Sequence, residues 1–232
     1  MLEFNPNLAK GGFRPMKVQD AINQRHSIRQ FTNKPVEKKM ITKIIELAQR
    51  APSWVNSQPW QVYCAMGNTL QKIKNTYHQQ DIAGKTGNSD LPVMSREKWA
   101  PQAQANMSQW RHGIVHHFAN FDEAHEKMTN ASNTLYDSPV ILYITIPKAS
   151  PDWSIFDAGL FAENIMLAAT AEGLGTIPTY NSVRFPALLH QILAVPEDER
   201  FIVGISLGYP ADTTINSYHS ERRPVNEILH FN

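Results

Sequence analysis

The sequence contains only one cysteine, Cys64, in 232 residues. A lone cysteine excludes an intramolecular disulfide, so a disulfide-stabilised secreted scaffold is excluded and a reducing compartment is favoured. Cys64 alternates with Trp60, Val62 and Met66 along the chain. That spacing predicts a half-buried strand in which the thiol is packed and unreactive.

Excess charge and long apolar runs are also missing. There are 22 basic and 21 acidic residues, a net charge of +1, so no broad basic surface for nucleic acid is expected. No run of about 18 apolar residues occurs, which argues against a membrane span. The first residues lack a basic-then-apolar leader pattern, so secretion is not expected and the cytoplasm is the default expectation.

Several common enzyme signatures are absent as well. The sequence has no G-x-G-x-x-G, G-x-x-x-x-G-K-[ST] or H-E-x-x-H, which removes the usual interpretations as a Rossmann dehydrogenase, a P-loop kinase or a zinc metalloprotease. His112, His116 and His117 include a helical i, i+4 pair of the kind that binds zinc. No Glu follows His112 and no Cys lies nearby. A polar helix face is therefore the favoured interpretation, and no metal is expected.

What the sequence does contain is an ordinary globular composition, with 42% hydrophobic and 9% aromatic residues, which predicts one α/β or α+β domain over 1–232. Apolar periodicity predicts helices over 17–25, 35–50 and 155–172, with Pro35 as a helix start. The last is apolar nearly all round and is expected to be central and buried. Strands are predicted over 60–66, 140–146 and 201–207. Residues 77–136 are polar and then loosely helical, and we interpret them as a lid insertion.

Two short segments carry most of the functional information. In Arg25-His26-Ser27-Ile28-Arg29, alternate residues share one face of an extended backbone. Two guanidinium groups and a hydroxyl on one face suit a phosphate group. Alone, such a segment is more often ordinary surface charge. The segment 52–60, Pro-Ser-Trp-Val-Asn-Ser-Gln-Pro-Trp, lies at a distance downstream that favours the binding interpretation.

Together these segments resemble the FMN-dependent nitroreductase family, whose chains carry R-x-S-x-R-x-F, a helix and then P-S-x-x-N-x-Q-P-W. Phe31 completes the first motif, and the likeness continues at 173–178, 204–210 and 221–224. It covers about residues 16–232 except a poorly matching middle. The resemblance implies an α+β fold with a mixed, mostly antiparallel sheet surrounded by helices, and a homodimer with FMN sites at the subunit interface.

The resemblance also implies roles for individual residues. Arg25, Ser27 and Arg222 would bind the FMN phosphate, and Arg29 the N1 and O2 edge of the ring. His26 would contribute at least a backbone amide. The turn at 52–56 would contact the ring largely from the partner subunit, and residues 178–180 would lie near N5. The full expected set is Arg25, His26, Ser27, Arg29, Pro52, Ser53, Trp54, Asn56, Asp157, Pro178, Thr179, Tyr180 and Arg222, with Asp157 placed at the pyrimidine.

The implied activity is NAD(P)H-dependent reduction of nitroaromatics, quinones or similar flat acceptors by a ping-pong mechanism, with NADH or NADPH as a transient hydride donor. Two alternatives within the same fold stay open, flavin breakdown and reductive dehalogenation. A third, of another class, is a non-catalytic flavin-binding or storage protein. Tyr180 stands where the family often has an acidic residue or glycine, which leaves the fit of the substrate open.

Overall fold

The computed structural model describes residues 16–232. Residues 1–15 lie outside the described residues. They are the first part of the expected domain and the segment in which no leader was expected. The four strands found there are β1 (Gln61–Met66), β2 (Val140–Pro147), β3 (Gly175–Thr179) and β4 (Glu199–Gly208). The helices are α1 (Val18–Gln24), α2 (Lys38–Ala48), α3 (Gly67–Ile82), α4 (Pro101–His116), α5 (Phe121–Asn133), α6 (Asp152–Ala171), α7 (Pro186–Leu193) and α8 (Thr214–Ser217).

The strands form one sheet in the order β1-β2-β4-β3, and every neighbouring pair is antiparallel. A single parallel bridge joins Ser27 to Thr176 at the outer edge of β3. The expected α+β class with a mostly antiparallel sheet is therefore confirmed, and the parallel part is this one bridge. The short strand β3 was not predicted from the sequence.

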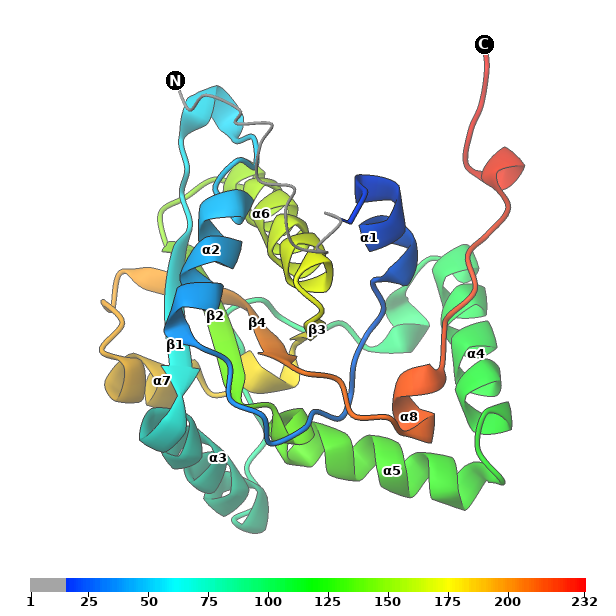
Figure 1. The fold of residues 1–232 in the computed structure, drawn as a ribbon, viewed down its shortest axis with the longest axis horizontal. Helices are drawn as coiled ribbons and strands as arrows, with labels where there is room; N and C mark the ends of the chain where they lie inside the picture. Colours follow the sequence, from blue (N-terminus) through cyan, green and yellow to red (C-terminus); the bar gives the residue numbers. More distant parts are fainter. Residues whose placement is uncertain (1–15) are drawn as a thin grey trace, which may run out of the picture.

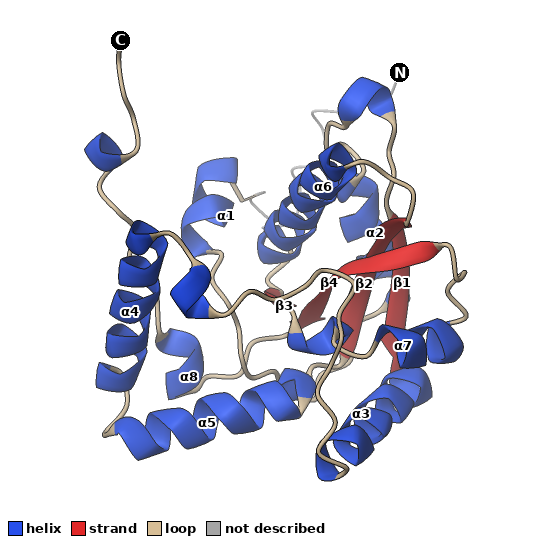
Figure 2. Ribbon diagram, turned by 180° about the vertical axis from the view of Figure 1, so that it is seen from behind, coloured by secondary structure: helices blue, strands red, loops and turns tan. Residues whose placement is uncertain are grey.

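Helices cover both faces of the sheet. Helices α2 and α6 lie on one face, and α3 and α7 on the other (Figures 1 and 2). Residues 140–146 of β2 are buried throughout, as predicted, because the strand is central and covered on both sides. On the α6 face, Trp60 stacks on Phe161 with ring centroids 4.6 Å apart. Trp60 is therefore a core aromatic.

Three predictions about these elements need correction. Helix α2 begins at Lys38 and not at Pro35, because Glu37 is still extended at φ −69° and ψ 140°. Cys64 is exposed and not packed, because β1 is an edge strand. The sulfur is nevertheless sheltered enough for desolvation to raise the pKa of the thiol, against the influence of Lys38. Helix α6 is not buried all round, since Trp153 and Phe156 are 56% and 57% exposed.

The predicted insertion contains ordered helices. Helix α3 occupies its beginning, and α4 and α5 pack on each other beside α8 (Figure 1). A small apolar cluster of Ile114, Phe118, Ala124 and Ile215 holds these helices together and is separate from the two cores of the sheet. Over residues 16–232 no helix has the length and apolar character needed to span a membrane.

The segment 25–29 follows α1 and runs along the outer edge of β3. The backbone N–H of Ile28 donates to the carbonyl of Thr176 at 3.0 Å. Gly175 permits this approach, since a Cβ there would lie 2.5 Å from Cγ1 of Ile28. The segment is thus extended, and Ile28 packs inward with Phe31 and Ile177.

A buried asparagine from α8 fixes this segment in place. The Oδ1 atom of Asn216 accepts the N–H groups of Arg29 (2.7 Å) and Gln30 (3.1 Å). Its Nδ2 atom donates to the carbonyls of Gln30 (2.7 Å) and Ala211 (2.8 Å). The residue is 6% exposed, so one buried side chain satisfies four backbone groups, of which the Gln30 carbonyl also accepts the N–H of Ala211 at 3.1 Å.

We predict that Asn216→Ala lowers the free energy of unfolding by about 3 kcal/mol, because buried polar groups left without partners cost about 1–3 kcal/mol each. Asn216→Asp is the matched variant, since its carboxylate still accepts from Arg29 and Gln30 but cannot donate to the two carbonyls. Its loss should be at least as large, because the oxygen that replaces Nδ2 is a buried charge facing two carbonyl oxygens. Urea unfolding of the three proteins measures the effect, and a change below about 0.5 kcal/mol for Asn216→Ala would contradict it.

Candidate functional site

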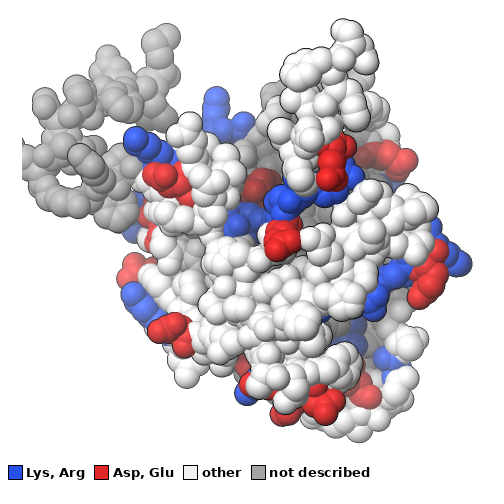
Figure 3. All heavy atoms as spheres, turned by 90° about the vertical axis from the view of Figure 1, so that its right-hand side faces the viewer, with Lys and Arg blue, Asp and Glu red and all other residues white. Residues whose placement is uncertain are grey.

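The R-x-S-x-R segment lines a cavity of about 310 Å³. Five of the predicted residues meet there although Arg222 lies almost 200 residues downstream of the others: Arg25, His26, Ser27, Arg29 and Arg222. The remaining wall comes from α1, from α4 and from the segment after α8, through Ile22, Asn23, Trp110, Tyr218, His219 and Ser220. Seen from the α4 side, basic side chains gather below the protruding C-terminal segment (Figure 3).

The three arginines of the cavity differ in their partners. Arg25 is paired with Glu163, Nε to Oε1 at 3.5 Å, although that carboxylate is 48% exposed. Arg222 is held locally, with Nη1 donating to the carbonyl and the hydroxyl of Ser220 at 3.0 and 2.7 Å. Among the described residues, neither Arg222 nor Arg29 forms an ion pair with a carboxylate. The cavity therefore has positive charge available for an anion.

Arg29 is the most deeply placed of these cations. It is 9% exposed, and its Nη1 donates to the carbonyl of Ser27 at 3.2 Å. Its guanidinium lies 5.9 Å from the centre of the Trp110 ring. Desolvation lowers the pKa of Arg29, and Tyr136 and Tyr218 partly oppose this. Arginine remains charged at ordinary pH, so Arg29 is a buried cation whose burial cost an anionic ligand would offset.

His26 is held in the cavity wall through both nitrogens of its ring. Its Nδ1 lies 2.8 Å from the carbonyl of Gln24, and its Nε2 lies 2.8 Å from the carbonyl of Asn216. The ring of His219 lies 3.9 Å from the ring of His26, with an angle of 35° between the two planes. Burial, followed by the neighbouring histidines His26 and His117, lowers the pKa of His219.

Three aromatic residues around Arg29 were not predicted from the sequence: Trp110, Tyr136 and Tyr218. They come from α4, from the 3-10 turn η3 (Leu135–Asp137) and from the segment after α8. Tyr136 also packs against the cluster of Ile28, Phe31 and Ile177. No local sequence signal links positions this far apart.

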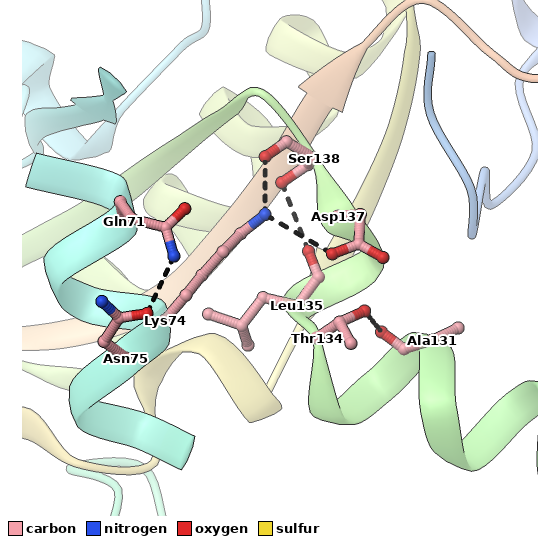
Figure 4. Close-up of polar contacts among 8 residues, drawn as sticks. All are labelled: Gln71, Lys74, Asn75, Ala131, Thr134, Leu135, Asp137 and Ser138. Atoms are coloured by element: carbon pink, nitrogen blue, oxygen red, sulfur yellow. Dashed lines mark hydrogen bonds and ion pairs between the residues drawn. The ribbon is translucent and has the colours of Figure 1, made fainter. Parts of the chain in front are cut away.

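The turn that carries Tyr136 has an unusual backbone. Leu135, Tyr136 and Asp137 have φ values of 51°, 62° and 50°, in the left-handed region that non-glycine residues rarely adopt. Lys74 reaches from α3 and donates to the carbonyl of Ser138 at 3.2 Å, with Asp137 Oδ1 at 3.9 Å (Figure 4). Desolvation lowers the pKa of Lys74, and Asp137 opposes this. A strained backbone held by a half-buried lysine beside the cavity is typical of a functional site.

The P-S-x-x-N segment forms a second strained turn, around η1 (Trp54–Asn56). Val55, Asn56 and Gln58 have φ values of 49°, 59° and 45°. Asp157 holds the turn: its Oδ2 accepts the N–H of Trp54 at 3.0 Å and the hydroxyl of Ser57 at 3.4 Å. The Asp157 side chain is buried, and both of these hydrogen bonds are with residues of the turn.

The turn is not part of the arginine cavity of its own chain. Asp157, which holds the turn, is in the second turn of α6. The cavity meets α6 further along, where Arg25 pairs with Glu163, and Ser27 pairs with Thr176 beyond the end of the helix. None of the residues that line the cavity belongs to the turn, so within one chain the structure does not bring Pro52, Ser53, Trp54 and Asn56 into its wall.

The residues predicted near N5 lie at the end of β3. Pro178 and Tyr180 are exposed, and Thr179 is buried with its carbonyl accepting the Ser182 hydroxyl at 2.8 Å. They continue the strand whose Thr176 pairs with Ser27, so they are close to the cavity in the fold.

Of the three histidines considered as metal ligands, His117 is held by hydrogen bonds: its Nε2 contacts the Thr214 carbonyl and the Ser217 hydroxyl. Residues 16–232 contain no metal-ligand cluster.

Comparison with known proteins identifies the family. The model of the Nitroreductase family matches residues 22–209, which is most of the chain. A 4-nitrobenzoate reductase of Pseudomonas putida is 28% identical over 214 residues, covering 90% of this chain and 93% of that protein. A 4-nitrobenzoate reductase of Nocardioides sp. is 25% identical over 217 residues, covering 90% and 87%.

The fold comparison agrees. The FMN-dependent nitroreductase NfnB from Mycobacterium smegmatis, solved in complex with NADPH, superposes with a TM-score of 0.84. It is 23% identical and the match covers 92% of this chain and 97% of that chain, which shows a shared fold. With the family model matching over most of its length, the chain belongs to the nitroreductase family.

Proposed function

We propose that this protein is an FMN-dependent nitroreductase that uses NADH or NADPH as hydride donor and reduces nitroaromatic acceptors. The observation that carries the proposal is the cationic cavity at the edge of β3. The family's own motif residues form it around Arg29, which is buried and has no ion-pair partner within residues 16–232. The relatives named as 4-nitrobenzoate reductases and the NADPH complex of NfnB support the acceptor class and the donor.

The residues present fit FMN. A terminal phosphate carries about two negative charges, and Arg25, Ser27 and Arg222 offer two guanidinium groups and a hydroxyl. Arg29 would face the N1 and O2 edge of the ring, and residues 178–180 would lie along it. When bound, FMN would supply the hydride-accepting and electron-donating chemistry, while the protein supplies orientation and electrostatics. A ping-pong order, with donor and acceptor occupying one site in turn, and quinones as further acceptors belong to the same proposal.

We further propose that two copies of the chain build each site. The turn is not among the residues that line the cavity of its own chain. Beside it, Trp54, Trp153 and Phe156 are 60%, 56% and 57% exposed. In the C-terminal segment, Ile228 and Phe231 are 59% and 90% exposed (Figure 1). Large exposed apolar groups of this kind mark interaction surfaces. In a homodimer the partner's turn would complete the site, and Asp157 would act by shaping that turn.

The remaining parts of the proposal concern domain organisation and compartment. We propose that residues 1–232 form one domain, in which α4 and α5 act as the lid. Trp110 of α4 already reaches Arg29, so this lid lies next to the cavity. A single cysteine and a nicotinamide donor favour a cytoplasmic enzyme.

The direct test is to purify the protein, release its flavin by heat and chromatograph it. We expect one FMN per subunit and no FAD, because the guanidinium groups and the hydroxyl of the cavity match the charge and the acceptor oxygens of a terminal phosphate. The loaded protein should then oxidise NADH or NADPH faster when a nitroaromatic is added under anaerobic conditions. A storage protein would keep FMN without turnover, and a dehalogenase would prefer halogenated phenols to nitroaromatics.

Arg25 and Arg29 should have separable roles. Arg25→Ala should weaken FMN binding about tenfold to a hundredfold, since a hydrogen bond to a charged group contributes about 1.5–3 kcal/mol. Arg29→Ala should instead lower the midpoint potential of bound FMN, because the reduced ring carries negative charge near N1. A loss of about 1.4 kcal/mol from the reduced form alone shifts a two-electron couple by about 30 mV. Apo-protein titration and anaerobic dye-coupled titration measure the two effects. Equal shifts in potential would show that the two arginines are wrongly placed on the cofactor.

Sharing of the site between subunits predicts complementation. One chain would carry Arg25→Ala with Arg29→Ala, and the other Trp54→Ala with Asn56→Ala. Each homodimer should be nearly inactive. A heterodimer purified with two different tags should regain activity, because one of its two sites then receives an intact cavity and an intact turn. If each chain built its own site, every site in the heterodimer would keep a defect and no activity would return.

A further inference from the structure

A second cavity lies between the lid helices α4 and α5 and is not part of the cationic cavity. Its volume is about 520 Å³, within the range of small-molecule sites. Most of its wall is apolar, through Ile114, Phe121, Ala124 and Met128, together with one face of Trp110. A flat aromatic ring fits such a surface better than a polar ligand does.

The groove also carries unneutralised positive charge. Arg96 and Arg111 both line it, and within residues 16–232 neither forms an ion pair with a carboxylate. The carboxylate of Glu97 interacts with both arginines: its pKa is lowered first by its own backbone N–H and by Ser95, and then by Arg96 and Arg111. That carboxylate is fully exposed, so it is hydrated and competes weakly for the two arginines.

Trp110 connects this groove to the cationic cavity. The residue lines both spaces, and its ring lies 5.9 Å from the guanidinium of Arg29. A ligand in the groove would therefore contact Trp110, which leads to Arg29, while Arg96 and Arg111 line the groove itself. Such a ligand needs an apolar ring with an anionic group at one end.

We propose that this groove is the acceptor subsite and that it selects anionic nitroaromatics, with a ring carboxylate paired to Arg96 and Arg111 and the nitro group directed past Trp110. The inference rests on the proposed nitroreductase function and adds the charge of the substrate to it. The names of the two 4-nitrobenzoate reductases among the relatives agree with this chemistry.

The test compares 4-nitrobenzoate with uncharged nitrobenzene on the FMN-loaded protein. We expect the wild type to prefer 4-nitrobenzoate in kcat/KM. In Arg96→Gln/Arg111→Gln, the ratio of the two kcat/KM values should fall by at least about tenfold, through a higher KM for the carboxylate. Lys127→Gln is the control for a loss of charge alone, since it removes one positive charge from α5 outside the groove and should leave the ratio unchanged.

Binding is measured separately from turnover by calorimetry with benzoate, which has the ring and the carboxylate but no nitro group. We expect benzoate to bind the loaded wild type, and the double variant to lose that binding. If both nitro compounds are reduced while the double variant keeps the wild-type ratio, the groove assignment is overturned and the reductase function stands. If neither compound is reduced, the proposed nitroreductase function is wrong. Loss of benzoate binding in the double variant would then still support the groove as a site for an aromatic carboxylate. If benzoate never binds and the double variant dissociates in sedimentation, the groove is covered by a second copy and the inference is wrong.

Discussion

The four hydrogen bonds of Asn216 are the constraint on which the site depends. They join a backbone segment near the N-terminus to one almost 190 residues later and so fix where Arg29 enters the interior. With the backbone held on one side by Asn216 and on the other by Thr176, the guanidinium stays buried beside Trp110 without a carboxylate partner. A cation held in this way is costly for folding and is pre-organised for an anion, which is the electrostatic basis of the proposed cofactor site.

The sequence predicted the elements whose apolar pattern is strong and continuous. The central strand β2 and the helix α6 were found because burial on several sides leaves long apolar runs. The strand β3 was missed because Gly175 and Pro178 weaken its local preference, and its pairing with β4 and Ser27 forms it instead. Cys64 was misjudged for a related reason. Alternation predicts which residues share a face of a strand, but not whether the strand lies at the edge of the sheet.

The candidate site was also predicted only in part, for similar reasons. The arginine segment was predicted because its residues are adjacent in sequence, and Arg222 because a second motif placed it; the structure brings all of them to one cavity. The aromatic surroundings of Arg29 were not predicted, since they come from three distant elements and only packing assembles them. Asp157 was predicted at the start of the helix that became α6, and the structure adds that its carboxylate accepts the N–H of Trp54 in the turn.

The separation of the turn from the cavity becomes intelligible once symmetry is considered. In a two-fold dimer each surface contacts its own copy, so one arrangement of α6 against α6 would carry both turns to both cavities at once. That arrangement would also cover Trp153 and Phe156, which the single chain leaves exposed on α6. In the proposed dimer, the exposed side chains of α6 and the separation of the turn from the cavity would be two consequences of one interface. The positive φ values of the turn and its hydrogen bonds to Asp157 fit that proposal, because a turn that contacts a ligand bound by another chain must keep its shape before the ligand arrives.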